Sequence, residues 1–558
     1  MCKRNKQQDD MKRYNQYIIL LATLMMGVLV GCQNEPAEVL QPEADYAFVE
    51  LSSQTTTIAE KGGIKTIYIA SNRIELEVQH QIDWLDVSVE GNAITIYVDA
   101  NNSGPSRLGV IDVVAGSDPD VARARLKVLQ EGSETKILSQ EGTANCYIAK
   151  PNSTYRFDAS VKGNAKRDGN SNYIAACGSR IEGASYAELA WEATFDGDKT
   201  RSTQIIDGTP LYLPEQKQIY FATGKSEGNA LVTLHSADGQ ILWSWHIWVV
   251  ADEVGTSTSA DGLVWMDRNL GALNNNVGDV ANRGMLYQWG RKEPFLPSPV
   301  EYQSVPTHRH DEDFNILESE EEYERVQAEI EAVRAVLNVN NEQRGEGIFE
   351  WSYVGEIAPV ALRAPGNIDY ALQNPTTFLG CRVDIPIGEY VFDWYLLQDL
   401  EGVGGLMQQS DSNLWGSGER GSDYKTIFDP CPVGYVVPPV GAFGEIPAGY
   451  ACSYVGRDWE AADYGWTWSG GNGDYFPSVG NFDVSGLMGE TSERMLYWTS
   501  ESFGSGYQGF GKAATLFVAF EDIYYGIYPL MDGAEMAAWY SYGARCYGAS
   551  VRCVKEQN

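Results

Sequence analysis

Cysteine and histidine are the side chains most often used for covalent and acid–base chemistry, and this sequence has only nine and five of them in 558 residues. No Cys-x-x-Cys, His-Glu-x-x-His, Gly-x-Ser-x-Gly or P-loop motif occurs. His308 and His310 lie close together, but Arg309 separates them and no third ligand follows at a metal-binding spacing. We therefore expect no catalytic residue, no metal and no cofactor.

The charge of the chain argues against two classes of partner. Lysine and arginine number 41 against 76 aspartate and glutamate residues, which gives a net charge of −35. Nucleic acid and an anionic membrane surface would both repel such a chain. We expect no nucleic-acid partner.

The first 32 residues have the pattern of an export signal. Two basic residues precede an apolar run at 17–30, which is short for a membrane-spanning helix. The run ends in Leu29-Val30-Gly31-Cys32, which resembles the lipobox of bacterial lipoproteins. The resemblance implies cleavage before Cys32 and a diacylglycerol on its thiol, and hence contact with the outer membrane through this lipid anchor only. Residues 33–46 are acidic and contain prolines, which predicts a flexible tether, and they resemble the surface-export signal of Bacteroidetes lipoproteins.

The composition favours β-rich domains with long loops. Aromatic residues make up 11% of the chain, with 57 glycines and 32 tyrosines. A chain of this length needs several cores, and we expect domains at 47–132, 133–252 and 253–558. The expected fold is multidomain and mainly β, with two N-terminal β-sandwiches followed by an α+β domain.

Residues 47–132 alternate apolar and polar side chains in the stretches 66–70, 74–78, 93–98 and 123–129. This pattern predicts a β-sandwich of immunoglobulin-like size. The order of Gly62-Gly63, Trp84 to Ser88, Asn101-Asn102 and Leu129 to Gly132 resembles the BACON family of Bacteroidetes. That family name implies carbohydrate binding, although many members look like spacers. Trp84 is the candidate for stacking on a sugar, and a core tryptophan is the alternative.

Residues 133–252 end in a hairpin, with strands 230–235 and 241–250 on either side of Asp238-Gly239. In the second strand, residues 243, 245, 247 and 249 share one face and residues 242, 244, 246 and 248 the other. An aromatic strand face can bind sugar rings, but more often it forms half of a sandwich core. We read His246 as structural. The segment resembles a middle domain of Bacteroidetes surface lipoproteins.

Residues 253–558 carry motifs in an order typical of another family. These motifs lie at 265–272, 287–295, 374–378, 429–435, 476–477, 497–500 and 551–555. Together they resemble the Fibrobacter succinogenes major paralogous domain family. The resemblance implies a C-type-lectin-like fold that presents variable loops for recognition. An insertion at about 300–370 departs from the compact pattern, and its stretch 316–337 has the apolar spacing of a surface helix.

The resemblance does not bring with it the calcium-dependent sugar site of C-type lectins. In place of Glu-Pro-Asn and Trp-Asn-Asp, this chain has Glu293-Pro294-Phe295 and Trp498-Thr499-Ser500, which lack the oxygen ligands that Ca²⁺ requires. Formylglycine-generating enzymes share the scaffold and use a reactive cysteine pair. Cys546 and Cys553 are the candidates for such a pair, but a structural disulfide of Cys553 is the simpler interpretation.

Seven cysteines follow the leader, and an oxidising envelope permits disulfides. We expect Cys431 to pair with Cys553, which would join the middle of residues 253–558 to their last strand. We also expect a bond between Cys146 and Cys177. An odd number leaves at least one cysteine unpaired unless a second chain takes part.

Two aromatic segments of 253–558 are the candidate recognition surface, and we expect both, 454–475 and 539–542, to be loops. Rings beside carboxylates suit stacking on sugars or anchoring of a protein partner. The candidate ligand-binding residues are Trp459, Tyr464, Trp466, Trp468, Asp474, Tyr475, Trp539 and Tyr542. For each ring the alternative is packing inside the fold.

The sequence thus predicts a cell-surface recognition or adhesion protein without enzymatic activity, with a glycan or a surface protein as its ligand. One alternative is a structural subunit, such as a pilus tip or an envelope scaffold. The other is an enzyme on the formylglycine-generating scaffold.

Overall fold

The computed structural model describes residues 46–557 with gaps at 102–103, 133, 167–171, 197–198, 202–203, 298–349, 354–365, 381–393, 395–412, 417–424, 445–452, 455–458, 469–472, 483–487, 490–493, 504–511 and 521–535. In several strands it describes the backbone without the side chains. The leader with Cys32, most of the tether, the two histidines at 308 and 310 and the helix expected at 316–337 lie outside the described residues.

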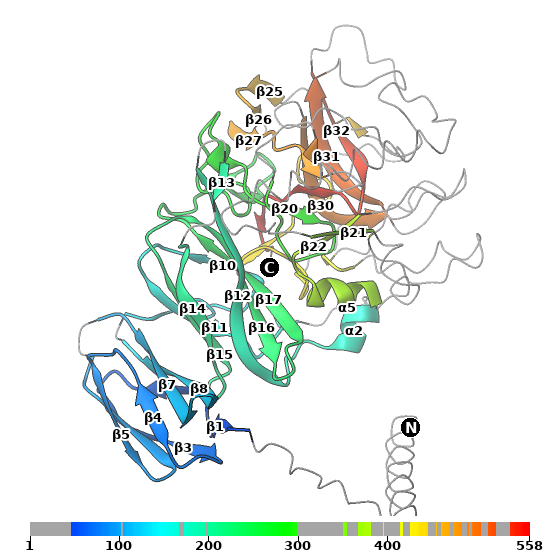
Figure 1. The fold of residues 1–558 in the computed structure, drawn as a ribbon. Coiled ribbons are helices and arrows are strands. Elements are labelled where there is room, and N and C mark those ends of the chain that lie inside the picture. The colour runs from blue at the N-terminus through cyan, green and yellow to red at the C-terminus, as the bar shows by residue number, and fades with distance from the viewer. Residues whose placement is uncertain are drawn as a thin grey trace, which may run out of the picture.

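The protein is mainly β, and its N-terminal sandwich is built from two four-stranded sheets (Figure 1). One sheet has the order β1 (Val49–Leu51), β3 (Gly63–Ser71), β6 (Ala93–Val98), β5 (Leu85–Glu90). The other has the order β2 (Thr55–Ile58), β8 (Asp120–Gln130), β7 (Arg107–Ser117), β4 (Leu76–Gln79). Alternate side chains of both sheets, Ile67, Ile94, Ile111 and Leu126 among them, form one core. The period-two stretches of the sequence correspond to β3, β4, β6 and β8.

Trp84 packs against this core. Its ring is half-buried against the sandwich interior, and the guanidinium carbon of Arg107 lies 4.6 Å from the ring centroid. The side chain therefore packs within the sandwich and does not form an open platform for a sugar.

A second pair of sheets follows. The first has the order β10 (Cys146–Ala149), β17 (Ile241–Val249), β16 (Gly228–Ser236), β12 (Ala184–Asp196), β13 (Lys199–Arg201), and the second has the order β14 (Ile206–Leu213), β15 (Gln218–Thr223), β11 (Thr154–Asp158), β9 (Lys136–Ile137). The expected hairpin is β16–β17, with Leu234 opposite Trp243. Trp245 of β17 packs on Phe157 of β11, with ring centroids 5.2 Å apart, so the two sheets share a core.

Several sheets follow in the C-terminal part. One of them has the order β18 (Thr256–Thr258), β19 (Val264–Met266), β34 (Val554–Lys555), β23 (Tyr435–Val436). A two-stranded sheet pairs β21 (Glu350–Tyr353) with β22 (Thr377–Gly380). The largest has the order β24 (Ser453–Tyr454), β32 (Met536–Ala544), β31 (Lys512–Phe520), β30 (Arg494–Phe503), β33 (Gly548–Ser550), β28 (Asn481–Phe482), β29 (Met488–Gly489), and β20 (Leu286–Gln288) pairs with β33. β25 (Trp459–Ala462), β26 (Gly465–Trp468) and β27 (Asp474–Pro477) form a small sheet at the end of the molecule away from the N-terminal sandwich (Figure 1).

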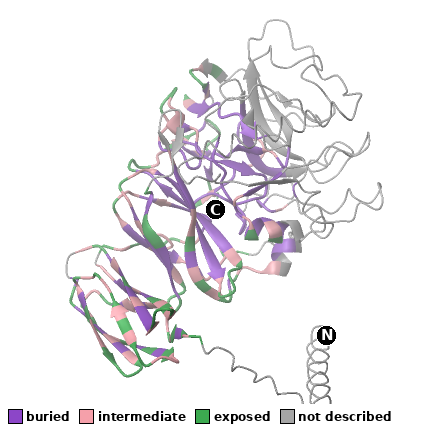
Figure 2. Cartoon of the chain, in the orientation of Figure 1, coloured by how far each residue is buried: buried purple, intermediate pink, exposed green. Residues whose placement is uncertain are grey.

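Residues on both sides of position 252 share one hydrophobic core. A single cluster of buried side chains runs from Cys146 and Trp245 to Trp289, Trp498 and Cys553, and Figure 2 shows buried ribbon continuing from the second sandwich into the C-terminal sheets. The boundary expected at 252 therefore does not divide the core. The N-terminal sandwich, by contrast, has a core of its own.

The face of β17 that carries Ser244, His246 and Trp248 is covered by the C-terminal part. Lys292 donates from Nζ to the Ser244 carbonyl at 3.1 Å, and Trp248 donates from Nε1 to the Ala272 carbonyl at 3.1 Å. From Trp243 to Val249 every side chain of this strand is buried. This face is thus an internal contact and does not bind sugar rings.

Helices are short in the described part of the chain: α2 (Asn172–Cys177), the 3-10 helix η1 (Val280–Asn282) and α5 (Gly366–Gln373). Tyr173 of α2 donates its hydroxyl to the Asp369 carboxylate of α5 at 2.5 Å. Among the residues described, no helix is both long enough and apolar enough to span a membrane.

Candidate functional site

The segment 454–475, expected as a loop, contains β25, β26 and the start of β27, which form a three-stranded antiparallel sheet with Trp466 opposite Phe476 and Trp468 opposite Asp474. Trp466 and Trp468 lie two residues apart in β26, so they share one face of the sheet. Both are buried, at 0% and 4% exposure, in a cluster with Trp265 and Phe476. The expectation that these two tryptophans bind ligand is therefore wrong, because their face of the sheet covers the core.

Tyr475 and Asp474 of β27 are also engaged within the fold. Tyr475 is buried and donates its hydroxyl to the Asp463 carbonyl at 2.6 Å, and burial raises its pKa. Asp474 is half-buried and accepts a hydrogen bond from the Ser257 hydroxyl of β18. Tyr475 is thus removed from the candidate ligand-binding residues, and Asp474 holds β27 to β18.

Trp459 and two further candidates lie in strands, although all three were expected in loops. Trp459 is opposite Trp468 in β25, and Trp539 and Tyr542 are opposite Phe517 and Ala514 in β32. Their side chains lie outside the described residues. Whether these rings contact a ligand stays a prediction.

Tyr464 is the candidate ring that the structure places in the open. It lies at the turn between β25 and β26, its side chain is 59% exposed, and its φ of 54° is in the left-handed region. Glycine, asparagine and aspartate are usual there, and a bulky residue in this conformation is strained. Gly465 follows directly. A Cβ on Gly465 would lie 2.4 Å from the Phe476 carbonyl oxygen, so the glycine is required one position after the turn.

Hydrogen bonds fix the turn from two sides. Ser478 donates its backbone N–H to the Tyr464 carbonyl at 2.7 Å, and Tyr475 holds the Asp463 carbonyl as described above. The backbone of Gly278 also approaches Asp463, because a Cβ on Gly278 would lie 3.6 Å from the Asp463 Cβ. This contact brings the loop of Asn276 and Val277 beside the turn.

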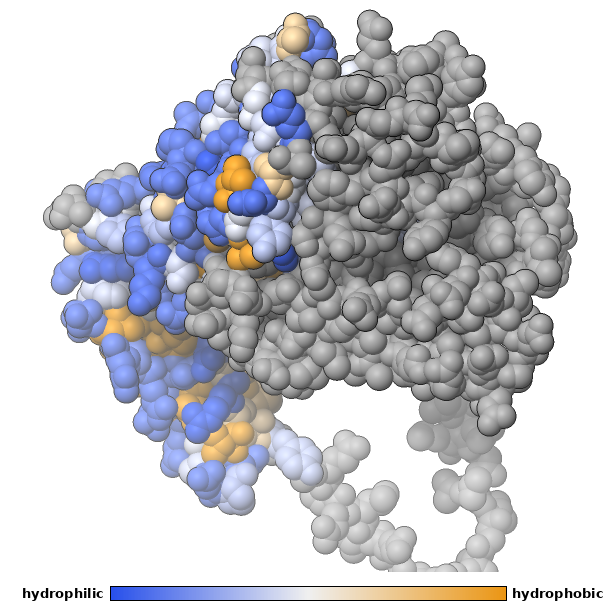
Figure 3. Space-filling view, turned by 90° about the horizontal axis from the view of Figure 1, so that it is seen from above, coloured by the Kyte–Doolittle hydropathy of each residue, from blue (hydrophilic) through white to orange (hydrophobic). Residues whose placement is uncertain are grey.

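We call Asp463, Tyr464, Asn276 and Val277 the hairpin tip. All four side chains are exposed, and together they offer a ring, an aliphatic group, a carboxylate and an amide. Figure 3 shows one face of the molecule, on which the described surface is mostly hydrophilic and hydrophobic residues appear in small separate spots. Asn276 and Val277 were not among the predicted residues. The only hint in the sequence is the turn-forming run Asn274-Asn275-Asn276-Val277-Gly278.

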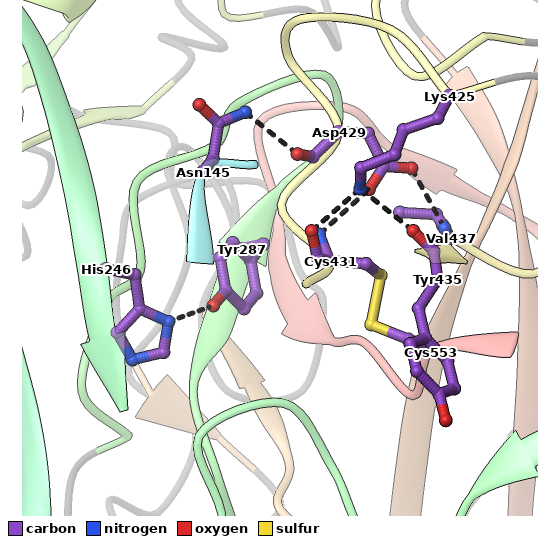
Figure 4. Close-up of a disulfide and its surroundings, with 9 residues drawn as sticks. All are labelled: Asn145, His246, Tyr287, Lys425, Asp429, Cys431, Tyr435, Val437 and Cys553. Carbon is purple, nitrogen blue, oxygen red and sulfur yellow. Dashed lines mark hydrogen bonds and ion pairs between the residues drawn. A yellow bond between two sulfur atoms is a disulfide. The ribbon is translucent and has the colours of Figure 1, made fainter. Parts of the chain in front are cut away.

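Cys431 and Cys553 form the expected disulfide, with Cα atoms 6.0 Å apart (Figure 4). The Asp429 carboxylate accepts from the backbone N–H of Cys431 at 2.8 Å and of Val437 at 3.0 Å. Lys425 donates from Nζ to Asp429 at 2.6 Å, as well as to two backbone carbonyls nearby. Burial raises the pKa of Asp429, and the Lys425 ammonium opposes that shift. The Asp-Pro-Cys-Pro motif is therefore a structural anchor.

The bond expected between Cys146 and Cys177 does not form. Cys146 is a buried thiol in β10, and the Cys177 sulfur at the end of α2 contacts the carbonyls of Ile174 and Gly178. The prediction failed because sequence spacing does not tell which side of each element faces the other. The reactive pair considered for Cys546 and Cys553 is excluded too, because Cys553 is bonded to Cys431 and Cys546 is a separate buried thiol.

Glu293, which belongs to the tripeptide compared above with the calcium motif of lectins, lies in a buried ion cluster. Its carboxylate is 2.7 Å from Nζ of Lys292 and 3.3 Å from Nε of Arg291. Burial by itself raises the pKa of Glu293, but the two cations outweigh it and the net pKa is lowered. Arg291 also donates to the Thr377 carbonyl at 2.8 Å. The motif thus joins β17, β22 and the segment after β20, and it does not face a ligand.

Among the described residues no group of three histidine, cysteine, aspartate or glutamate side chains has the geometry to hold a metal ion. No family model matches the chain, and no characterised protein matches its sequence.

Solved structures give weak matches to parts of the chain. A protein from Bacteroides thetaiotaomicron solved by NMR is 18% identical, over 18% of this chain and 98% of its own, with a TM-score of 0.13. A tandem of immunoglobulin domains from titin is 12% identical, over 37% of this chain and 97% of its own, with a TM-score of 0.13. An endo-fucoidan hydrolase of glycoside hydrolase family 107 is 10% identical, over 39% of this chain and 30% of its own, with a TM-score of 0.13. TM-scores this low do not establish a shared fold, so the family resemblances stay predictions.

Proposed function

We propose that this protein is a lipid-anchored recognition protein of a Gram-negative cell surface, and that the hairpin tip binds a surface glycan. The observation that carries the proposal is Tyr464. A large exposed ring occupies a strained backbone position at the end of a supported turn, where asparagine or glycine would be more stable. Retained strain of this kind is typical of functional sites.

The groups around Tyr464 suit a sugar. An exposed tyrosine ring can stack on the apolar face of a pyranose, and Asp463 and Asn276 can accept and donate hydrogen bonds to its hydroxyls. The anchor at Cys32 and the BACON-like and lectin-like motifs support the same proposal. The tip lies at the end of the described molecule away from the N-terminal sandwich (Figure 1), so the tether would leave it accessible.

A binding protein also fits better than an enzyme at two buried side chains, His246 and Cys146, which burial holds in their neutral forms. Burial lowers the pKa of His246 to about 3 and raises the pKa of the Cys146 thiol far above its ordinary value. Neither side chain can therefore serve as a catalyst at neutral pH.

The test uses a glycan array with the soluble chain that begins at Gln33. We expect capture of a glycan by the wild type and loss of capture by Tyr464→Asn, which keeps the turn conformation. Tyr46→Asn is the matched control, since Tyr46 is an exposed tyrosine at 77% exposure outside the tip, and it should behave as wild type. Equal capture by Tyr464→Asn and wild type would refute the role of the tip, and wild-type protein that captures no glycan on the array would refute the proposed ligand.

Anchoring is tested separately. Replacing Cys32 with alanine should abolish labelling by radioactive palmitate and release the protein from the membrane fraction. Unchanged labelling of Cys32→Ala would show that the leader is an ordinary secretory signal.

A further inference from the structure

Exposed large hydrophobic side chains concentrate in the N-terminal sandwich and not in the C-terminal part. Of the eleven that the described residues contain, eight lie between Tyr46 and Val110. Such side chains are common singly on a protein surface, so their arrangement decides whether they have a role. Ile74 and Tyr46 are the two most exposed of the eleven, at 100% and 77%.

Hydrogen bonds hold Tyr46 and Phe48 beside the segment that carries Ile74. Oδ1 of Asn72 accepts from the backbone N–H of Phe48 at 2.9 Å, and Nδ2 of the same side chain donates to the Tyr46 carbonyl at 2.8 Å. The Ser71 hydroxyl donates to the Phe48 carbonyl at 2.9 Å. Ile74 follows Asn72 by two residues. We call Tyr46, Phe48 and Ile74 the tether-side patch, because the described part of the chain begins here.

A second loop fixes the same end of the sandwich. Asp120 accepts through Oδ1 from the backbone N–H of Ala47 at 2.8 Å and is paired with the guanidinium of Arg73. Both contacts lower the pKa of Asp120, so its carboxylate is charged and paired. Glu75 and Asp118 add two exposed carboxylates on the same two loops. The patch is thus a small apolar surface with a negative rim, which an anionic surface would repel.

The opposite end of this sandwich is joined to the second pair of sheets. Leu108 and Leu129 pack with buried side chains of β14 and β15, and the Tyr220 hydroxyl donates to the Ser106 carbonyl at 3.2 Å. The strand β7 extends from this contact to the loop at 117–120, a length of about 30 Å. The tether-side patch is therefore at the free end of the sandwich, and the other end is fixed to the rest of the molecule.

The size and the position of the patch select its partner. A stable protein–protein interface needs about 800 Å² on each partner, and three side chains of at most about 200 Å² each offer less. Tyr46 is separated from the expected lipid at Cys32 by a chain that extends at most about 50 Å. So short a link gives the lipid surface an effective concentration on the order of millimolar at the patch. Weak contacts with the lipid surface around the anchor are therefore sufficient.

We propose that the tether-side patch rests on the zwitterionic lipid surface that holds the anchor, with Tyr46, Phe48 and Ile74 inserted among the headgroups. Aromatic rings favour this interfacial layer, and an aliphatic side chain beside them adds apolar contact. The negative rim stays in water, where it faces the ammonium groups of zwitterionic lipids. This contact depends on the lipid anchor of the proposed function, and it adds a second attachment to the one at Cys32, which was the only membrane contact expected from the sequence.

Such a contact sets the orientation of the whole molecule. The lipid alone retains the protein at the membrane without fixing which side faces outward. Contact through one end of a sandwich whose other end is fixed to the second pair of sheets turns the far end of the molecule away from the membrane. The hairpin tip lies at that far end (Figure 1). The tether-side patch thus presents the hairpin tip to the medium.

The test is hydrogen exchange of the soluble chain from Gln33, tethered to phosphatidylcholine vesicles through an N-terminal hexahistidine tag and a nickel-chelating lipid. The tag replaces the lipid at Cys32, so the outcome depends on neither lipidation nor glycan capture. We expect the amides of 72–75 and 117–120 to exchange at least about threefold more slowly on the vesicles than after release by imidazole. The amides of the hairpin tip at 276–278 should exchange at the same rate in both states.

Substitutions then assign the protection to the patch. A Phe48→Ser, Ile74→Ser double variant should lose it. Ile64→Ser is the matched control, because Ile64 is a 68% exposed isoleucine at the other end of β3, and it should be protected as wild type is. Flotation with the vesicles checks that every variant is tethered, and thermal melts check that every variant is folded.

Each other outcome overturns the proposal. Equal exchange of 72–75 on the vesicles and after release would do so, as would full protection in the double variant. Protection of the hairpin tip in place of 72–75 would show the reverse orientation. Protection on phosphatidylglycerol vesicles alone would show that the patch selects an anionic surface and not a zwitterionic one.

Discussion

The hydroxyl oxygen of Tyr287 lies 3.2 Å from Nδ1 of His246, and this contact joins β20 to the covered face of β17 (Figure 4). On the other side of the ring, Nε2 is 2.8 Å from Oδ1 of Asn229. Asn229 donates from Nδ2 to the Gly271 carbonyl, so its Oδ1 faces the histidine as an acceptor. Nε2 therefore carries the proton, and Nδ1 accepts from Tyr287.

This neutral histidine predicts a loss of stability in acid. Burial lowers its pKa from 6.5 to about 3, so between these values the unfolded chain binds a proton that the folded chain does not. The free energy of unfolding should then fall by about 1.4 kcal/mol per pH unit from this residue as the pH drops below 6.5. In chemical denaturation from pH 7 to pH 4, the advantage of wild type over His246→Gln should shrink steadily. A constant difference would contradict the assignment.

Removal of the charge of Glu293 should be strongly destabilising. Glu293→Gln leaves the ammonium of Lys292 and the guanidinium of Arg291 buried without a counter-charge. Breaking a buried pair in this way typically costs about 3–5 kcal/mol, which urea unfolding measures. Glu215→Gln is the control, because its pair with Lys65 is exposed and 4.0 Å long, and it should unfold as wild type does. Equal urea midpoints for wild type, Glu293→Gln and Glu215→Gln would show that the buried ion cluster does not stabilise the fold.

Reduction of the Cys431–Cys553 bond should lower stability by a similar amount. The bond spans a sequence separation of 122, and closure of a loop of that size contributes up to about 4–5 kcal/mol on the chain-entropy model. A Cys431→Ala, Cys553→Ala double variant should unfold at lower guanidinium concentration, and a reducing agent should shift wild type but not this variant. Cys177→Ser, which leaves the disulfide intact, should keep the response to reducing agent. A wild-type midpoint that is insensitive to reduction would be evidence against the bond.

The core that crosses position 252 predicts how fragments behave. A fragment of residues 253–558 loses the partners of Lys292, Tyr287 and Ala272 and exposes the apolar surface that covers β17. We expect it to bind a hydrophobic dye and to melt without cooperativity, whereas residues 134–558 should melt cooperatively. Residues 46–132 have their own core and should fold alone. A cooperative melt of 253–558 would show that the shared core is dispensable.

Local patterns predicted individual elements well and their packing poorly. The Asp238-Gly239 turn and the alternation around it were sufficient for β16–β17. The same alternation places Trp466 and Trp468 on one face of β26, but it does not tell whether that face meets solvent or Trp265 of a distant strand. Burial depends on what the rest of the chain brings to the face, which a local pattern does not contain.

For the candidate site, too, the sequence predicted the segment but not which of its side chains are exposed. Tyr464 was predicted with seven other residues, and its exposure and its strained turn, which only the structure shows, distinguish it from the buried rings.

The strand β34 has a consequence for the order in which the protein matures. It lies between β19 and β23, and the residue before it is Cys553, the partner of Cys431. Synthesis proceeds from the N-terminus, so the strands at 264–266 and 435–436 are complete long before residues 554–555 leave the ribosome. Until then β19 presents an open edge and Cys431 remains a thiol, both of which invite pairing with other chains. The N-terminal sandwich can therefore fold before residues 554–555 are in place, whereas the sheet of β19 and β23 closes only once these residues have joined it.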